Sequence, residues 1–169
     1  MQVKQVSTLE QLASLREQWR LLDRGIPFRG WEWLLPCWRH CGRALGGELY
    51  TLACFDGDTL VALAPWYRQR TPLGRVVRAL GDGVICSDYL GVPCAPGRAP
   101  EVAEALVRHL TAARSPAGWD LLRLEGQDPD DPVLAALCTL LRARDHAVTE
   151  QPGPRCWRIT LPCSAGAAG

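Results

Sequence analysis

The sequence predicts an α+β fold, a mostly antiparallel mixed sheet with helices on both faces. Apolar runs at 48–55 and 59–69 flank Asp56-Gly57-Asp58, a pattern that is typical of an antiparallel hairpin. One pair of helical segments precedes this hairpin, and later helical segments alternate with single strands. A strand that follows a helix joins the sheet through a crossover, so helices are expected over both faces.

The composition indicates one globular domain without a strongly charged surface. Of the 169 residues, 47% are hydrophobic, and the 19 basic residues nearly balance the 18 acidic ones. This balance argues against nucleic acid and anionic lipid as partners. The first residues lack the apolar stretch of a secretion signal, and no apolar run is long enough to span a bilayer. We therefore expect a cytoplasmic protein with no membrane partner, and its eight scattered cysteines to be buried, reduced thiols.

The N-terminal part predicts a strand over 2–6 and a helix behind it. Ser7 and Glu10 form an S-x-x-E capping box, and Gly25 and Pro27 end the helix. Its apolar stripe consists of Leu9, Leu12, Leu15, Trp19 and Leu22.

A second helix is predicted over 31–43, where Pro36 must fall in the first turn or bend the helix. Its expected inner side consists of Trp31, Leu34, Leu35, Trp38 and Cys41. Cys37, His40 and Cys41 offer three zinc ligands, but no second Cys/His cluster completes a tetrahedral set, so we predict no metal site.

Beyond the hairpin, strands are predicted over 76–80 and 84–92, split by Gly81-Asp82-Gly83, and a proline-rich loop follows over 93–100. The remaining predicted elements are a helix over 101–114, a strand over 119–124, a helix that Asp131 caps and Pro132 begins, and terminal strands over 146–149 and 157–161.

This order resembles the GNAT acyltransferase superfamily, and the local sequence is similar to its CelD-like branch. We expect a GNAT-like N-terminal lobe over 1–162 and a disordered small-residue tail over 163–169. The matching pieces are Trp19 with Leu22, Phe28 before Trp33-Leu34-Leu35 and Trp38, the run 60–67, Leu80-Gly81 before Ser87-Asp88-Tyr89-Leu90, and the run 119–124.

The resemblance implies transfer of an acyl group from acetyl-CoA or another acyl-CoA to a small-molecule amine. Members of the family continue past the equivalent of 159–162 into a second lobe that is expected to hold the acyl-CoA. The chain is therefore expected to be inactive alone and to pair with a second GNAT lobe or with a copy of itself. The alternative is a non-catalytic acceptor-recognition or docking module.

Two stretches resemble the loop that binds the CoA pyrophosphate through backbone N–H groups at a helix start. Residues 78–83 match its letters, but a strand is predicted to follow them, so a tight turn is the preferred interpretation. Gly97, Arg98 and Ala99 lie between a strand and a helix, although prolines there remove N–H donors. A degenerate cofactor loop and a plain surface loop remain open for this second stretch.

Asp88 and Tyr89 form the best catalytic candidate pair. Asp88 would hold or deprotonate the amine and Tyr89 would line the groove, as the resemblance implies. The tyrosine that the family places near the last helix has no counterpart in residues 126–144. The alternative is structural, with Asp88 capping a turn and Tyr89 packing.

Overall fold

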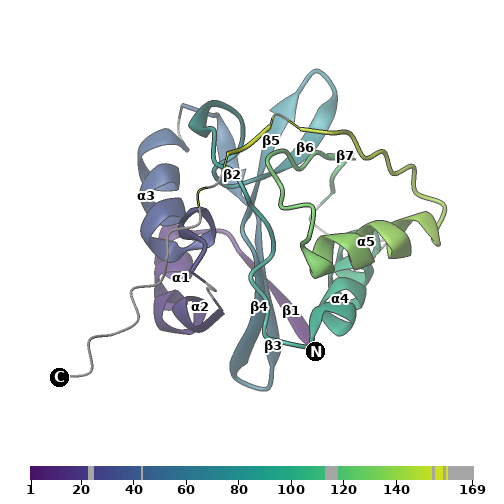
Figure 1. The fold of residues 1–169 in the computed structure, drawn as a ribbon, viewed down its shortest axis with the longest axis horizontal. Helices are drawn as coiled ribbons and strands as arrows, with labels where there is room; N and C mark the ends of the chain where they lie inside the picture. Colours follow the sequence, from purple (N-terminus) through teal and green to yellow (C-terminus); the bar gives the residue numbers. More distant parts are fainter. Residues whose placement is uncertain (23–24, 43, 113–117, 154, 158, 160–169) are drawn as a thin grey trace.

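The computed structural model describes residues 1–22, 25–42, 44–112, 118–153, 155–157 and 159. It confirms an α+β fold with mostly antiparallel sheets. Figure 1 shows α1, α2 and α3 on one side of the strands and α4 with α5 on the other. None of the described helices is both long and apolar enough to cross a bilayer.

The N-terminal strand is as predicted, and the helix behind it is capped one residue later than predicted. β1 (Gln2–Val6) pairs antiparallel with β3 (Thr51–Asp56). The predicted cap at Ser7 and Glu10 is wrong. Thr8 is the N-cap, its hydroxyl accepts from the Gln11 backbone N–H at 3.2 Å, and the Gln11 side chain accepts from the Thr8 N–H at 3.3 Å. The overlapping T-x-x-Q provides the same reciprocal pair one position later.

The predicted first helix is divided at Leu15 into α1 (Leu9–Ser14) and α2 (Arg16–Leu22). Its apolar stripe nevertheless faces the core. Leu12, Leu15, Trp19 and Leu22 are buried, and Leu9 packs against them half-buried.

α3 (Trp31–Cys41) follows a short 3-10 helix at Pro27–Arg29. Leu34 and Leu35 are buried, as predicted. Pro36 lies inside the helix, past the first turn, at an exposed position. An exposed site tolerates the lost N–H donor because solvent can reach the carbonyl that it leaves free.

The two long hairpin strands are each divided, and their halves enter different sheets. β3 and β4 (Thr59–Ala64) belong to the sheet β1-β3-β4, while β2 (Gly47–Leu49) and β5 (Trp66–Thr71) belong to the sheet β2-β5-β6-β7. Pro65 separates β4 from β5 and lacks the N–H that a continuous ladder needs. Across the break, the Tyr50 N–H donates to the Trp66 carbonyl at 3.1 Å. The hairpin therefore joins the two sheets.

The second sheet is mixed. β6 (Gly74–Ala79) runs antiparallel to β5, and β7 (Leu121–Leu122) runs parallel to β6 after the crossover helix α4 (Ala99–Thr111). The strand predicted over 119–124 is thus shorter than expected. α5 (Pro132–Arg142) packs against α4, and the Asp131 carboxylate accepts from two N–H groups of its first turn, which confirms the predicted cap.

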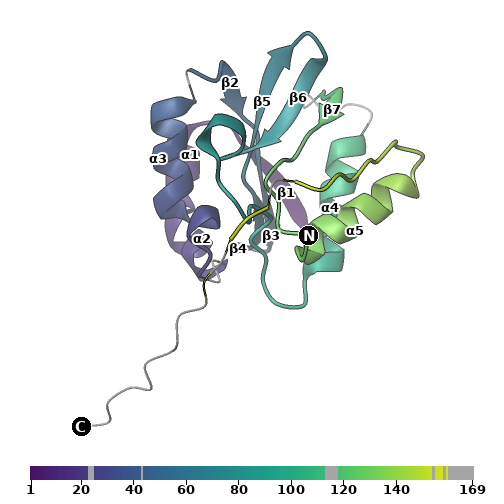
Figure 2. The same cartoon turned by 45° about the horizontal axis from the view of Figure 1, so that its top comes forward.

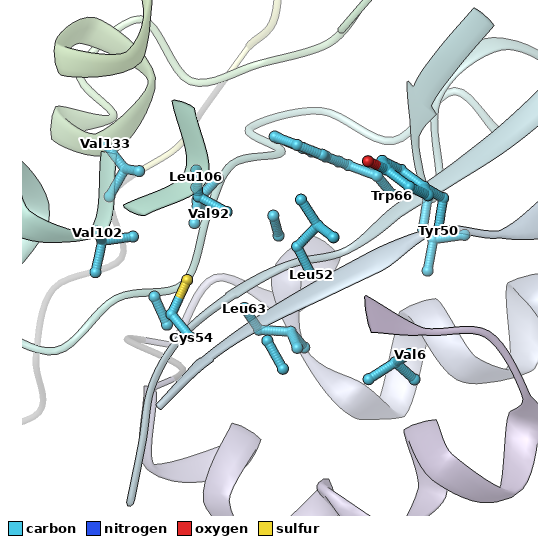
Figure 3. Close-up of a cluster of buried hydrophobic side chains, with 14 of the residues drawn as sticks. Val6, Tyr50, Leu52, Cys54, Leu63, Trp66, Val92, Val102, Leu106 and Val133 are labelled. Carbon is cyan, nitrogen blue, oxygen red and sulfur yellow. The ribbon is translucent and has the colours of Figure 1, made fainter. Parts of the chain in front are cut away.

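The core lies between the sheets and the helices on each side. Figure 3 shows side chains from strands and helices meeting there, among them Val6, Leu52, Leu63, Leu106 and Val133. Residues 146–149, 157 and 159 form no strand, so the predicted terminal strands are not seen in the described residues. Residues 158, 160–162 and the predicted tail 163–169 lie outside them.

Candidate functional site

The segment that carries Asp88 and Tyr89 is a loop, and the strand predicted over 84–92 is wrong. Residues 80–91, here called the 80–91 loop, leave the sheet after β6 and contain a 3-10 turn at Gly83–Ile85. Gly81 has φ +89°, and a side chain there would meet the Ser87 hydroxyl at 2.9 Å. This left-handed backbone ends the strand β6. The apolar residues that follow resemble a further strand but do not form one. Residues 92–95 then return beside β4, with Ala95 N–H donating to Val61 at 2.8 Å.

An ionic cluster around the buried Asp82 fixes the start of the 80–91 loop to the sheet. The Asp82 side chain is 0% exposed and accepts from Arg78 Nε at 3.1 Å and from the Tyr67 hydroxyl at 3.3 Å. Arg78 also pairs with Glu125 at 2.8 Å. Burial raises the pKa of Asp82 to about 6 and, with the Asp82 charge, raises the pKa of Tyr67 to about 12. Tyr67 therefore acts as a fixed, neutral donor.

Two further side chains hold the middle of the loop. The Trp33 indole N–H donates to the Ser87 hydroxyl at 2.8 Å. Arg29 donates through Nε to the Tyr89 carbonyl at 2.6 Å and through Nη2 to the Leu90 carbonyl at 3.3 Å. The loop is therefore held in one conformation that includes positive φ at Cys86 and Tyr89.

Asp88 and Tyr89 lie half-buried at the molecular surface. The Asp88 carboxylate contacts Cys156, and the hydrogen bond between them raises the pKa of the Cys156 thiol. Asp88 forms no ion pair with any other residue of the described ranges. Asp88 and Tyr89 line neither the recess beside Arg29 and Gly97 nor the recess beside Val3 and His109.

Gly97, Arg98 and Ala99 form the entry to α4, as the sequence predicts. Arg98 is the N-cap residue but makes no capping bond with its side chain. Its Nη2 instead lies 3.0 Å from Asp56 and 2.9 Å from Glu101, and these hydrogen bonds raise the pKa of Arg98. Two carboxylates thus face one guanidinium at this helix start, and Pro100 removes one N–H donor from the first turn.

A recess of about 90 Å³ adjoins this helix start. Arg29 lines the recess and also bonds the 80–91 loop, so one side chain touches both predicted sites. Arg29 is itself tied to Asp128 at 2.7 Å and to Asp131 at 3.6 Å. The other lining residues are Leu22, Ile26, Val92, Pro93, Cys94, Ala95, Gly97, Ala99 and Pro132.

The competing stretch 78–83 forms the tight turn that the sequence favours. A three-residue 3-10 turn begins at Gly83, and Asp82 is buried in its ion pair with Arg78. A phosphate at this turn would meet a carboxylate without the amide array of an α-helix start.

The cysteines were predicted to be buried, but among the seven that the structure describes only Cys54 is buried. Burial, followed by the neighbouring Cys41, raises the pKa of the Cys37 thiol. In the described ranges, His, Cys, Asp and Glu side chains form no group of three or more suited to a metal ion.

Sequence reasoning missed Arg29, Asp128 and Trp33 as organising residues and assigned Asp131 only a capping role. Arg29 lies 99 residues from Asp128, and Trp33 lies 54 residues from Ser87. Local periodicity carries no signal for such pairs. The one local hint is the isolated Arg29 between Phe28 and Gly30, in a segment without helical or strand pattern.

Comparisons with protein-family models, with curated proteins and with solved structures return no match to this chain.

Proposed function

We propose that this chain is a GNAT-like lobe of an N-acyltransferase that contributes the acceptor side, with the acyl-CoA held by another lobe. The order of elements supports this proposal. An antiparallel hairpin is followed by β6, the crossover helix α4 and the parallel strand β7. The predicted cofactor loop lies between the strand-like segment 92–95 and α4, which is where the resemblance places it.

The observation that carries the proposal is the charge at the start of α4. A CoA pyrophosphate needs free amide donors and unpaired positive charge. Arg98 instead bridges Asp56 and Glu101, so this entry holds one positive charge against two negative ones. The adjoining recess of about 90 Å³ lies beside Asp131. These features disfavour a dianionic ligand and favour a lobe that handles the acceptor.

One observation favours the alternative, an autonomous acyltransferase. Gly97 has φ +76°, and the space where its side chain would stand is open. A phosphate can therefore approach the backbone before α4 without meeting a side chain. A titration with acetyl-CoA decides between the two functions.

Calorimetric titration with acetyl-CoA tests the proposal. We expect no binding by the chain alone at ligand concentrations of about 1 mM. In the Asp56→Asn, Glu101→Gln double variant Arg98 is unpaired, and weak binding there would show that the two carboxylates exclude the ligand. A dissociation constant near 10 μM for the unmodified chain would overturn the proposal and establish the autonomous enzyme.

A further inference from the structure

The recess beside the start of α4 is enclosed by three parts of the chain. The end of α2 contributes Leu22, the segment 92–99 leads into α4, and Asp131 and Pro132 begin α5. Figures 1 and 2 both show the segment before α4 running between α2 and the start of α5. The cavity measures about 90 Å³. It is here called the Arg29 recess, after the cation among its described lining residues.

The guanidinium of Arg29 turns one of its nitrogens toward this recess. Its Nε and Nη2 donate to Tyr89, Leu90 and Asp128, none of which lines the recess. Its Nη1 lies 3.6 Å from Asp131, which does line the recess. That distance allows an ion pair but no hydrogen bond. The two N–H groups of Nη1 therefore lack a hydrogen-bond acceptor among the described residues, although the Arg29 side chain is only 14% exposed.

Asp131 cannot move to supply the missing acceptor. Its Oδ1 accepts from two N–H groups of α5 at 2.9 and 3.0 Å, and its Oδ2 accepts from the Val92 N–H at 2.9 Å. A side chain at Gly91 would lie 2.1 Å from Asp131 Oδ2 and 2.8 Å from Arg29 Cζ, so the backbone holds both groups from that side. A largely buried donor without an acceptor is costly, and a molecule that accepts from Nη1 removes that cost.

The charges around Arg29 select a neutral molecule for this position. One guanidinium faces the two carboxylates of Asp128 and Asp131, which leaves one negative charge in excess. A carboxylate or phosphate in the recess would be repelled, whereas a neutral carbonyl oxygen can accept both N–H groups. Apolar side chains, among them Leu22, Val92 and Pro132, line the recess beside this polar group. Apolar walls with a few fixed polar groups are typical of small-molecule sites.

We propose that the Arg29 recess binds a small neutral carbonyl compound, such as a short-chain amide. The carbonyl oxygen accepts from Arg29 Nη1, and the alkyl group lies against the apolar walls. This ligand differs in charge from the anionic cofactor and from the amine that the family resemblance implies. The site does not depend on the proposed function, which the titration with acetyl-CoA decides separately.

The test compares isobutyramide with isobutyrate at pH 7, because the two have the same shape and only isobutyrate is charged. Binding is followed through the backbone N–H signals of Gly97 and Ala99, which line the recess, with Gly57 in the hairpin turn as the reference. We expect isobutyramide to shift the first two signals with a dissociation constant of about 10–50 mM and to leave Gly57 unshifted. Isobutyrate should bind at least about fivefold more weakly.

Ala99→Leu enlarges a side chain that lines the recess and should weaken isobutyramide binding, followed at Gly97, by at least about fivefold. Ala112→Leu, the same change at the exposed far end of α4, should leave binding unchanged. The proposal is overturned if isobutyrate binds as well as isobutyramide, if Ala99→Leu binds isobutyramide like the unmodified chain, or if Gly97 and Ala99 stay unshifted at about 100 mM isobutyramide. The comparison of the two compounds needs no variant, so it holds even where a substitution perturbs folding.

Discussion

Asp82 shows how a single buried carboxylate can organise a loop at a cost in stability. Its burial raises its pKa to about 6, even though Arg78 and Tyr67 stabilise the charged form. Arg78 and Tyr67 therefore only partly compensate the Asp82 carboxylate for the loss of its hydration. Replacement of the ion pair by apolar residues would remove that cost but would also release the 80–91 loop from the sheet.

Asp82 should make the protein more stable as the pH falls from 7 to 5. Its pKa is about 6 when folded, against 3.8 as the ordinary value, so the folded state binds more protons than the unfolded chain in this range. The expected gain in the free energy of unfolding is about 1 kcal/mol, and it is lost again as the pH rises through 6. Urea unfolding at pH 5 and pH 7 measures it.

Asp82→Asn is the control for this pH effect, because it removes the titrating group. Burial lowers the pKa of His109, which acts in the opposite direction, but it does so equally in both proteins. An identical pH dependence for the unmodified chain and for Asp82→Asn would contradict the assignment to Asp82.

Among the secondary-structure elements, α1 has two overlapping capping patterns at its start, and its structure shows which of the two is used. The Thr8 hydroxyl bonds the Gln11 N–H, whereas the Ser7 hydroxyl accepts only from the exposed Gln5 side chain among its described bonds. Thr8→Ala should lower the free energy of unfolding by about 1 kcal/mol, because the Gln11 N–H in the first turn of α1 loses its acceptor. Ser7→Ala is the matched control and should change it by less than about 0.5 kcal/mol. A larger effect at Ser7 than at Thr8 in urea unfolding would place the cap where the sequence first suggests it.

The division of the hairpin strands is a second feature at this scale. Pro65 interrupts the ladder, and the bond from Tyr50 to Trp66 carries the pairing across the break. The apolar runs predict two long strands because strand periodicity is a local property of the sequence. The change from one sheet to the other depends instead on the strands with which each half pairs. Proline is the residue from which the break follows.

At the scale of the whole molecule, the helices and most strands follow from local pattern, and the site does not. Asp131 and Pro132 define the start of α5 within two residues, and the structure agrees. The 80–91 loop is different. Its apolar letters suggest a strand, but its path is set by Arg29, Trp33 and Arg78, which reach it from three separate elements. Tertiary contacts override strand propensity there.

We propose that this lobe presents an acceptor surface and leaves the start of α4 without a nucleotide. Amide NMR during titration with acetyl-CoA tests it most directly, because the Gly97, Ala99 and Glu101 N–H groups report on any phosphate at that helix start. We predict that these three signals stay unshifted at about 1 mM acetyl-CoA. Saturable shifts at Gly97 and Ala99 in the low micromolar range would contradict the account.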